Sequence, residues 1–432
     1  MLRASLTCLA MRAASARTMR LQHAGPDFRL PPADPAQRYL LYVHVPFCPT
    51  LCPFCSFHRV ELQPAKALRY FPALHRQIEA YARDGYRISG VYVGGGTPTA
   101  VPQALIDTLQ LVRDRFGAVP VSIETNPSDL RPDMLEKLRG YGVTRLSVGV
   151  QSFDDALLER MGRRERYGDA ASIRERLREL RGLFPTLNVD MIFNLPDQSR
   201  QSLQHDLDVV REEAAIDQVS FYPLMSTRST RRAMNLRMGG WSGNREARYY
   251  ETIRGQLRQT HEMSSAWCFS RRGGTIDEYI VNDEEYLGAG SGAFGYIAGT
   301  FYSNSFSLPR YSARIAAGAS PVTMYRRMAE VDRMRYDLLV KLFSGTLDVA
   351  ALDLKYGGRF RRRLWPELAW FRMIGAVRGD RDRLQLTDSG AYVLVTMMRE
   401  FLSGVNRFRE QLRRNIRQEF TGGESMDAEA TD

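Results

Sequence analysis

Residues 42–57 read Tyr-Val-His-Val-Pro-Phe-Cys-Pro-Thr-Leu-Cys-Pro-Phe-Cys-Ser-Phe. The cysteines Cys48, Cys52 and Cys55 stand four and three residues apart, so their thiols can converge on one small inorganic centre. Iron–sulfur clusters normally take four thiolates, and structural zinc normally takes four protein ligands. Three thiols on one short loop therefore leave one coordination position for a ligand other than protein.

A zinc site is the alternative interpretation of these thiols, with His44 or His58 as the fourth ligand. The zinc spacings that recur pair two C-x2-C units or add a distant pair of histidines, and the spacing here does neither. Apolar side chains around the thiols also favour a cluster, because their burial would shield it from water and oxygen. These side chains are Phe47, Leu51, Phe54 and Phe57.

Strands and helices are expected to alternate around the cysteine loop. The mainly apolar run Tyr39 to Val45 has the length of a strand and delivers the loop at its C-terminal end, where chemistry collects in parallel α/β barrels. A helical stretch, Lys66 to Arg83, leads to a second strand from Ile88. Further strands are predicted at 119–125, 145–150, 188–193 and 218–223, with amphipathic helices between them. This alternation predicts a parallel sheet with helices outside it.

Polar residues at the ends of these strands are the candidate ligand contacts. The second strand ends in Gly-Gly-Gly-Thr-Pro-Thr, residues 94–99, where missing side chains let a ligand reach the main chain, although a plain turn would look the same. Glu124, Gln151 and Asp190 end later strands. Strands of parallel sheets are buried on both faces, so these polar groups should be costly unless they face a ligand. An ion pair or a capping contact is the structural alternative for each.

The cysteine spacing after a strand resembles the radical S-adenosylmethionine (SAM) superfamily. The preceding Tyr-Val-His-Val-Pro-Phe narrows the resemblance to the branch of oxygen-independent coproporphyrinogen III oxidase and its heme-handling and methylating relatives. The resemblance implies a [4Fe-4S] cluster whose open iron binds SAM, which is split into methionine and a 5′-deoxyadenosyl radical. It also implies an α/β fold, a partial (β/α)6 TIM-like barrel followed by a small, mainly helical, winged-helix-like C-terminal domain.

The resemblance also assigns candidate site residues. Arg163 lies in Met-Gly-Arg and has Arg160, Arg164 and Arg166 as close competitors for the same role. The cluster ligands implied are Cys48, Cys52 and Cys55. The residues implied to contact SAM are Tyr42, Phe54, Gly95, Gly96, Thr97, Glu124, Gln151, Arg163 and Asp190.

Four segments are expected along the chain. Residues 1–35 are predicted to be disordered or targeting-like, because 1–26 carry four Arg and no acidic residue. Residues 36–310 would form the barrel with its closing segment, 311–415 the C-terminal domain, and 416–432 an acidic tail. Periodicity fades over 224–279, so a loop over the barrel mouth is expected there.

A glycine-rich segment and its continuation bear on the reaction. Glycines between Gly288 and Gly295, beside aromatic residues, would suit close approach of the backbone to a flat ligand or a tight closure of the barrel. Residues 299–308, Gly-Thr-Phe-Tyr-Ser-Asn-Ser-Phe-Ser-Leu, resemble heme-utilisation members that methylate heme and open its ring. A class C methyltransferase using two SAM molecules is therefore the preferred hypothesis.

Two other functions remain open. The first is an oxidase-like enzyme that decarboxylates a tetrapyrrole, although Phe57 stands where the true oxidase has a further Cys. The second is a non-catalytic heme chaperone, although Arg271-Arg-Gly-Gly-Thr stands where that relative has a His-Asn motif. In either case the substrate or cargo is a tetrapyrrole, and a reduced ferredoxin or flavodoxin is the electron donor that the resemblance implies.

Composition sets the remaining expectations. Five cysteines in 432 residues are no disulfide framework and indicate a reducing compartment, so we expect a cytoplasmic protein, with an organelle as the alternative. Cys268 is expected to be a buried thiol rather than a ligand. The formal charge of +11 is spread as Arg along helices, which favours a solvated face over a nucleic-acid site. No membrane span is expected, and a monomer is preferred.

Overall fold

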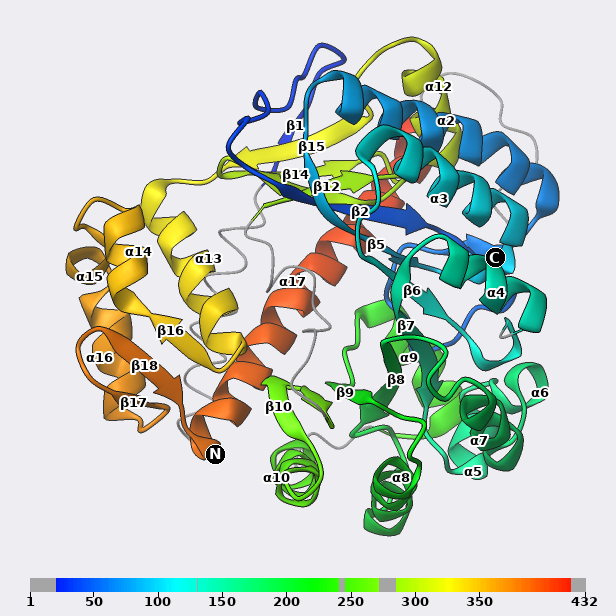
Figure 1. Ribbon diagram of the computed structural model, residues 1–432, viewed down its shortest axis with the longest axis vertical. Helices are drawn as coiled ribbons and strands as arrows, with labels where there is room; N and C mark the ends of the chain where they lie inside the picture. The colour runs from blue at the N-terminus through cyan, green and yellow to red at the C-terminus, as the bar shows by residue number, and fades with distance from the viewer. Residues whose placement is uncertain (1–20, 130, 241–244, 272–284, 421–432) are drawn as a thin grey trace.

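A single curved sheet organises the structure, a computed structural model that describes residues 21–129, 131–240, 245–271 and 285–420 (Figure 1). Its central strands are parallel and follow one another in chain order, which confirms the predicted alternation. These strands are β2 (Tyr39–Val45), β5 (Ile88–Gly95), β6 (Val121–Thr125), β7 (Val143–Gln151), β8 (Thr186–Phe193) and β9 (Gln218–Pro223).

Amphipathic helices connect the parallel strands and cover the outer face of the sheet (Figure 1). In α2, buried side chains such as Leu74 and Ile78 recur four residues apart, so one face of the helix packs on the sheet. Ser199 caps α8 by accepting a hydrogen bond from the backbone of Ser202. The covering helices are α2 (Pro64–Arg83), α3 (Pro102–Phe116), α4 (Pro132–Gly140), α5 (Asp155–Arg160), α6 (Arg164–Tyr167), α7 (Ala170–Glu179) and α8 (Arg200–Glu212).

Further strands, all but β12 paired only antiparallel, extend the sheet at both ends. On one side β12 pairs parallel with β2, and β13, β14, β15 and β1 follow; on the other side β11 and β10 follow β9. The edge strands β1 and β10 are not paired with each other, so the described residues form an open, partial barrel, as predicted. The added strands are β1 (Gln22–His23), β10 (Glu262–Ser265), β11 (Cys268–Ser270), β12 (Tyr286–Ala289), β13 (Phe294–Ile297), β14 (Thr300–Asn304) and β15 (Val322–Arg327).

The glycine-rich segment serves internal packing. A Cβ on Gly288 would overlap the carbonyl oxygen of Phe294, and one on Gly290, where φ is +103°, would lie 2.5 Å from the carbonyl oxygen of His44. The amide of Gly290 donates to Oε1 of Gln77 on α2, at 2.9 Å. Asn304 donates to the carbonyl oxygens of Gly288 and Gly290, at 3.0 and 2.9 Å. Of the two interpretations of these glycines, the structure favours the tight closure of the barrel.

This packing makes Gly288 sensitive to substitution. We expect Gly288→Ala to lower the free energy of unfolding by about 1–3 kcal/mol, because the added methyl group must displace the backbone at Phe294. Chemical denaturation monitored by circular dichroism would measure the change. Gly255→Ala in helix α10 (Glu246–Leu257) is the matched control. Its Cβ would have no atom within 4 Å, so we expect unchanged or slightly higher stability. Equal destabilisation by both substitutions would contradict this account of Gly288.

The C-terminal region is mainly helical around a small antiparallel sheet of order β16-β18-β17. Its last helix, α17 (Asp388–Phe420), crosses the open side of the large sheet (Figure 1). The region comprises α13 (Glu330–Phe343), β16 (Thr346–Asp348), α14 (Val349–Lys355), α15 (Phe360–Arg363), α16 (Trp365–Met373), β17 (Val377–Gly379), β18 (Arg383–Leu386) and α17, whereas α12 (Leu308–Ala316) packs beside α2 on the large sheet (Figure 1). This agrees with the expected helical C-terminal region, while the domain boundaries stay predictions.

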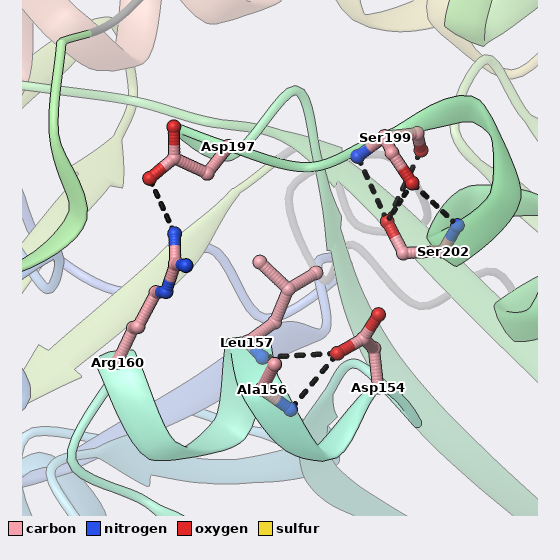
Figure 2. Close-up of a pocket in the computed structure, with 7 residues that line it drawn as sticks. All are labelled: Asp154, Ala156, Leu157, Arg160, Asp197, Ser199 and Ser202. Atoms are coloured by element: carbon pink, nitrogen blue, oxygen red, sulfur yellow. Dashed lines mark hydrogen bonds and ion pairs between the residues drawn. The ribbon is translucent and has the colours of Figure 1, made fainter.

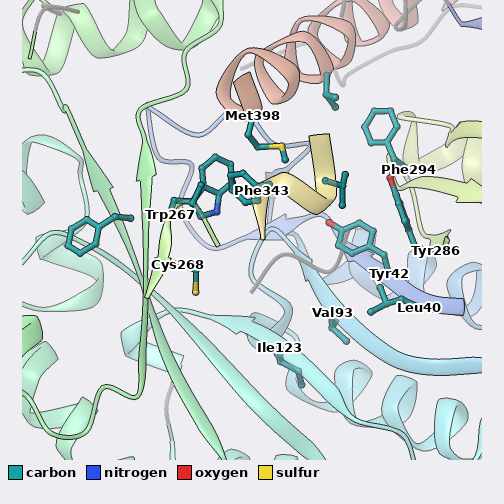
Figure 3. Packing of buried hydrophobic residues seen from close by; sticks show 14 of the residues in the cluster. Leu40, Tyr42, Val93, Ile123, Trp267, Cys268, Tyr286, Phe294, Phe343 and Met398 are labelled. Atoms are coloured by element: carbon teal, nitrogen blue, oxygen red, sulfur yellow. The ribbon is translucent and has the colours of Figure 1, made fainter. Parts of the chain in front are cut away.

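The two parts share a buried interface. Trp267, which is fully buried beside β11, packs edge-on against Phe343 of α13 with ring centroids 4.6 Å apart, and Met398 of α17 lies next to them (Figure 3). Cys268 is also fully buried, in agreement with its expected role. Near the middle of α17, Asn406 donates to the Ser56 hydroxyl at 2.7 Å. The C-terminal helix therefore reaches from the β11 end of the large sheet to the cysteine loop.

Three local expectations differ from the structure. Residues 224–279 are not simply a loop, because Thr227 and Thr230 form a capping box that begins helix α9 (Arg228–Met238), and α10 (Glu246–Leu257) follows. Near the N-terminus, β1 pairs with β15, so 21–26 are not disordered. Helix α17 continues to Phe420, past the expected start of the acidic tail. Residues 1–20 and 421–432 lie outside the described part. None of the described helices has the length and apolarity to cross a bilayer.

Candidate functional site

The three thiols lie on the loop between β2 and α2, at the C-terminal end of β2. Cys48 ends the short strand β3 (Phe47–Cys48), which pairs with β4 (Val60–Glu61) and closes the loop. Cys48 and Cys52 are buried, and Cys55 is half-buried. Arg59 donates to the carbonyl oxygens of Cys52 and Cys55 at 2.5 and 2.9 Å, so one guanidinium fixes the backbone of the loop.

The thiols affect one another electrostatically. Burial and, to a smaller extent, the neighbouring Cys55 thiol raise the pKa of the Cys48 thiol to about 12, although the Thr97 hydroxyl and Arg59 act in the opposite direction. For Arg59, burial lowers the pKa, but the cysteines, Cys55 first, outweigh it and raise the pKa overall. A cluster is bound by thiolates. The positive charge of Arg59 is therefore suited to a site that collects negative charge on sulfur.

The zinc alternative does not fit. His44 accepts or donates at both ring nitrogens, with the Tyr42 hydroxyl 2.9 Å from Nδ1 and the carbonyl oxygen of His58 2.8 Å from Nε2. Nε2 of His58 lies 3.3 Å from the Ser291 hydroxyl. Among the described side chains, no three His, Cys, Asp or Glu groups are placed to hold a single metal ion. A cluster does not require that convergence, because each thiolate binds a different iron.

A hydrogen-bonded arc joins two of the sulfurs. The Thr97 hydroxyl donates to Sγ of Cys48 at 3.8 Å, and Nδ2 of Asn126 donates to the same hydroxyl oxygen at 2.9 Å. Oδ1 of Asn126 accepts from Nη2 of Arg163 at 2.9 Å, and Nη1 of Arg163 donates to Sγ of Cys52 at 3.3 Å. The arc therefore runs from Cys48 to Cys52 through side chains of three different loops. Sequence reasoning missed Asn126, although its place just beyond the end of β6 was a signal.

Arg163 is the one of four neighbouring arginines that reaches the thiols. It is buried, stacks over the ring of Tyr167 at 4.3 Å, and leaves Nε without a hydrogen-bond partner in the described part of the chain. Arg164 and Arg166 are exposed. Arg160 pairs with Asp197 at the rim of an open pocket of about 370 Å³ between the starts of α5 and α8, away from the thiols (Figure 2). That pocket contains none of the predicted site residues.

Glu124 ends β6 beside the glycine turn. It accepts hydrogen bonds from the Tyr92 hydroxyl and from the amide of Gly95, both at 3.0 Å. A Cβ on Gly94 would lie 2.6 Å from its carboxylate, so the missing side chain makes room for Glu124. Desolvation raises the pKa of Glu124, although both hydrogen bonds oppose the rise. Tyr42 lies on the neighbouring strand, with its ring 6.1 Å from that of Tyr92.

Gln151 and Asp190 lie further along the sheet. Gln151 has a φ of +77°, a conformation that non-glycine residues rarely adopt and that occurs often at functional sites. Asp190 accepts from the Ser147 hydroxyl at 2.9 Å and from the Asn188 side chain at 2.8 Å. Ser147 is the register partner of Glu124, so these polar groups continue along neighbouring strands.

The structure thus brings part of the predicted set into direct contact. The linked residues are Cys48, Cys52, Thr97 and Arg163, with Gly95 and Glu124 adjoining through the glycine turn. Asp190 belongs to a neighbouring hydrogen-bonded group, and Phe54 is buried on the loop. The assignment of these side chains to SAM or cluster stays a prediction. The buried donors at two sulfurs and the unpaired Nε of Arg163 fit a cluster and an anionic ligand.

Comparison with known proteins gives the class. The model of the radical SAM superfamily matches residues 42–210. The heme chaperone HemW of Mycobacterium tuberculosis is 31% identical over 389 residues, which cover 85% of this chain and 96% of that protein. The oxygen-independent coproporphyrinogen III oxidase of Bradyrhizobium diazoefficiens is 26% identical over 399 residues, 84% and 86% of the two chains. The chain therefore belongs to the radical SAM superfamily.

Within that superfamily, the chain belongs to the branch that contains HemW and oxygen-independent coproporphyrinogen III oxidase. The solved structure of the Escherichia coli oxidase HemN has the same fold, with a TM-score of 0.71, 24% identity, and coverage of 92% of this chain and 93% of that one. The superfamily binds a [4Fe-4S] cluster and SAM, which confirms the predicted cofactors.

The preference for a class C methyltransferase is not supported. The relatives reported above are named a heme chaperone and a coproporphyrinogen III oxidase. Residues 300–307, part of the segment on which the methyltransferase hypothesis depended, are all buried, and their polar groups serve the barrel closure. Asn304 bonds the glycine segment, and the Tyr302 hydroxyl accepts from the amide of Gly288 at 2.9 Å. This segment therefore has a structural role in the closure of the barrel.

Proposed function

We propose that this protein cleaves SAM at a [4Fe-4S] cluster held by Cys48, Cys52 and Cys55, and that it uses this chemistry on a tetrapyrrole. The arc from Cys48 to Cys52 is the observation that carries the proposal. It places a hydroxyl and a guanidinium as donors to two sulfurs, as the outer shell of a cluster requires. When bound, the two cofactors supply one-electron cleavage of SAM, and the protein supplies orientation and exclusion of water.

The chain's own residues have separable tasks in this proposal. Arg59 fixes the loop backbone, and Arg163 offers positive charge and an unpaired Nε toward the carboxylate of SAM. Glu124, at the glycine turn, accepts hydrogen bonds and is placed to accept from the ammonium or ribose groups of SAM. Phe47 and Phe54 are buried at the loop and keep water from the thiols.

The reaction proposed first is that of an oxidase-like enzyme. A hydrogen atom is taken from a tetrapyrrole propionate, the carboxyl group leaves as carbon dioxide, and the remaining electron passes to an external one-electron acceptor. The support for this reaction is the relative named coproporphyrinogen III oxidase, with 84% of this chain aligned, and the fold shared with HemN. The net charge of +11 suits an anionic ring. Phe57 stands where the true oxidase has a further Cys, and it lies half-exposed under the guanidinium of Arg409. The proposal therefore includes a substrate or product that differs from that of the true oxidase.

A heme chaperone is the second candidate, because the HemW of Mycobacterium tuberculosis aligns over 96% of its length. The segment after Arg271, where that relative was expected to differ, includes residues 272–284, which lie outside the described part. This candidate predicts tight heme binding without consumption of SAM.

One experiment separates the candidates. The full chain would be reconstituted anaerobically with iron and sulfide, reduced with dithionite and incubated with SAM and either coproporphyrinogen III or heme. Production of 5′-deoxyadenosine together with a decarboxylated ring, seen by mass spectrometry, would support the oxidase-like function. Stoichiometric heme binding with no ring product would support the chaperone. Absence of both SAM cleavage and heme binding would contradict the proposed function.

A further inference from the structure

We infer that Asn126 is a positioning residue that sets the reduction potential of the cluster, by directing two hydrogen-bond donors onto the sulfurs of Cys48 and Cys52. The inference rests on the proposed function, since it requires the cluster on these thiols. Asn126 touches neither sulfur. It acts through Thr97 on one side and through Arg163 on the other.

The chemistry of the partners fixes how the amide of Asn126 points. A guanidinium can only donate, so the atom of Asn126 that faces Nη2 of Arg163, 2.9 Å away, must be the oxygen. The atom that faces Thr97, also 2.9 Å away, must then be the amide nitrogen, which donates to the hydroxyl oxygen. Thr97 has one hydroxyl hydrogen and does not need it for Asn126. That hydrogen is therefore available to Sγ of Cys48, 3.8 Å away.

The same amide restricts Arg163. With Nη2 held by Oδ1 of Asn126 and the carbonyl oxygen of Gly149, Nη1 is directed at Sγ of Cys52, 3.3 Å away. Asn126 is buried, so water does not compete for these contacts. One side chain thus determines the direction of donors at two sulfurs.

The sign of the effect follows from charge. In the redox step an external low-potential reductant gives one electron to the cluster, and no bond to the protein forms or breaks. The added negative charge spreads onto the sulfurs, so donors at Cys48 and Cys52 stabilise the reduced state more than the oxidised state. If Asn126 is replaced, Thr97 and Arg163 are no longer held in position to donate to the two sulfurs, and the cluster should become harder to reduce.

The test is a dithionite titration of the reconstituted full chain without SAM, followed by electron paramagnetic resonance. We expect Asn126→Leu to lower the equilibrium constant of one-electron reduction about tenfold, which is a potential ~59 mV more negative. In a Thr97→Val background the same substitution should have a smaller effect, because one of its two donors is already absent. Thr396→Val, which removes a buried hydroxyl of α17 that donates to the carbonyl oxygen of Val393 and to no thiol, is the control and should leave the potential unchanged.

The outcomes are distinct. An unchanged potential in Asn126→Leu, or an equal shift with and without Thr97, would overturn the inference. If Asn126→Leu takes up no cluster, the same-shaped Asn126→Asp replaces it. Its carboxylate still accepts from Arg163 but turns the Thr97 hydrogen away from Cys48, so a more negative potential is expected and an unchanged one overturns the inference. Failure of the unsubstituted chain to form a cluster would overturn the proposed function, whereas a cluster insensitive to Asn126 would overturn only this inference.

Discussion

Replacing Cys48 by Ala should abolish the [4Fe-4S] cluster and, with it, SAM cleavage. Outer-shell substitutions at metal sites cost 10–100-fold, so loss of a ligand should reduce 5′-deoxyadenosine formation by more than about 100-fold. The same result is expected for Cys52→Ala and Cys55→Ala, because the three thiols of the loop act as one ligand set. The measurements are the visible absorption of the reconstituted protein and the yield of 5′-deoxyadenosine.

Cys268→Ala is the matched control for loss of a thiol. Cys268 is fully buried on β11, away from the cysteine loop, so the variant should keep its iron, its sulfide and its SAM cleavage. Normal cluster content in Cys48→Ala, or equal loss in Cys268→Ala, would refute the assignment of the ligands.

Arg163→Leu should have the second-largest effect. The substitution leaves the side-chain oxygen of Asn126 and Sγ of Cys52 without their donor and removes the charge between them. Hydrogen bonds to charged groups contribute about 1.5–3 kcal/mol each. A combined loss of about 3 kcal/mol corresponds to a decrease of roughly 100-fold in the specificity constant for SAM cleavage.

Arg160→Leu provides the comparison, because Arg160 lies three residues away, is about half exposed and pairs with Asp197 outside the site. It should change SAM cleavage by less than about twofold, as exposed ion pairs contribute little. If Arg160→Leu impaired SAM cleavage as much as Arg163→Leu, the choice of Arg163 among its neighbours would be wrong.

Much of the fold could be predicted from local patterns. The strand Gln218–Pro223 was predicted with its observed bounds, because apolar runs separated by amphipathic helices identify a parallel sheet. The antiparallel strands β13 to β15 were not predicted. Their pairing depends on contacts between residues far apart in the sequence, such as Asn304 with Gly288. A local pattern of apolar residues contains no information about such contacts. The helix α9 was missed because its apolar residues are few and its capping box joins two threonines.

The part of the candidate site that could be predicted consists of residues whose type alone indicates their chemistry. The cysteine spacing and the carboxylate of Glu124 could be recognised in the linear sequence. Asn126 and Arg59 were missed, because an amide and an arginine are common residues whose role appears only when folding places them at the sulfurs or at the loop carbonyls. The position of Asn126 just after a predicted strand was the one signal that the sequence offered for it. The glycines near Gly288 were ambiguous for the same reason, since a glycine beside a ligand and one beside a carbonyl oxygen look alike in sequence.

The central claim is that three thiolates hold a [4Fe-4S] cluster with one iron left for SAM. It is tested most directly by electron paramagnetic resonance of the reduced, reconstituted chain before and after addition of SAM, with iron and sulfide analysed on the same sample. The account predicts about four irons and four sulfides per chain and a cluster signal whose shape changes when SAM binds. A single zinc ion per chain, or a cluster signal that SAM leaves unchanged, would contradict it.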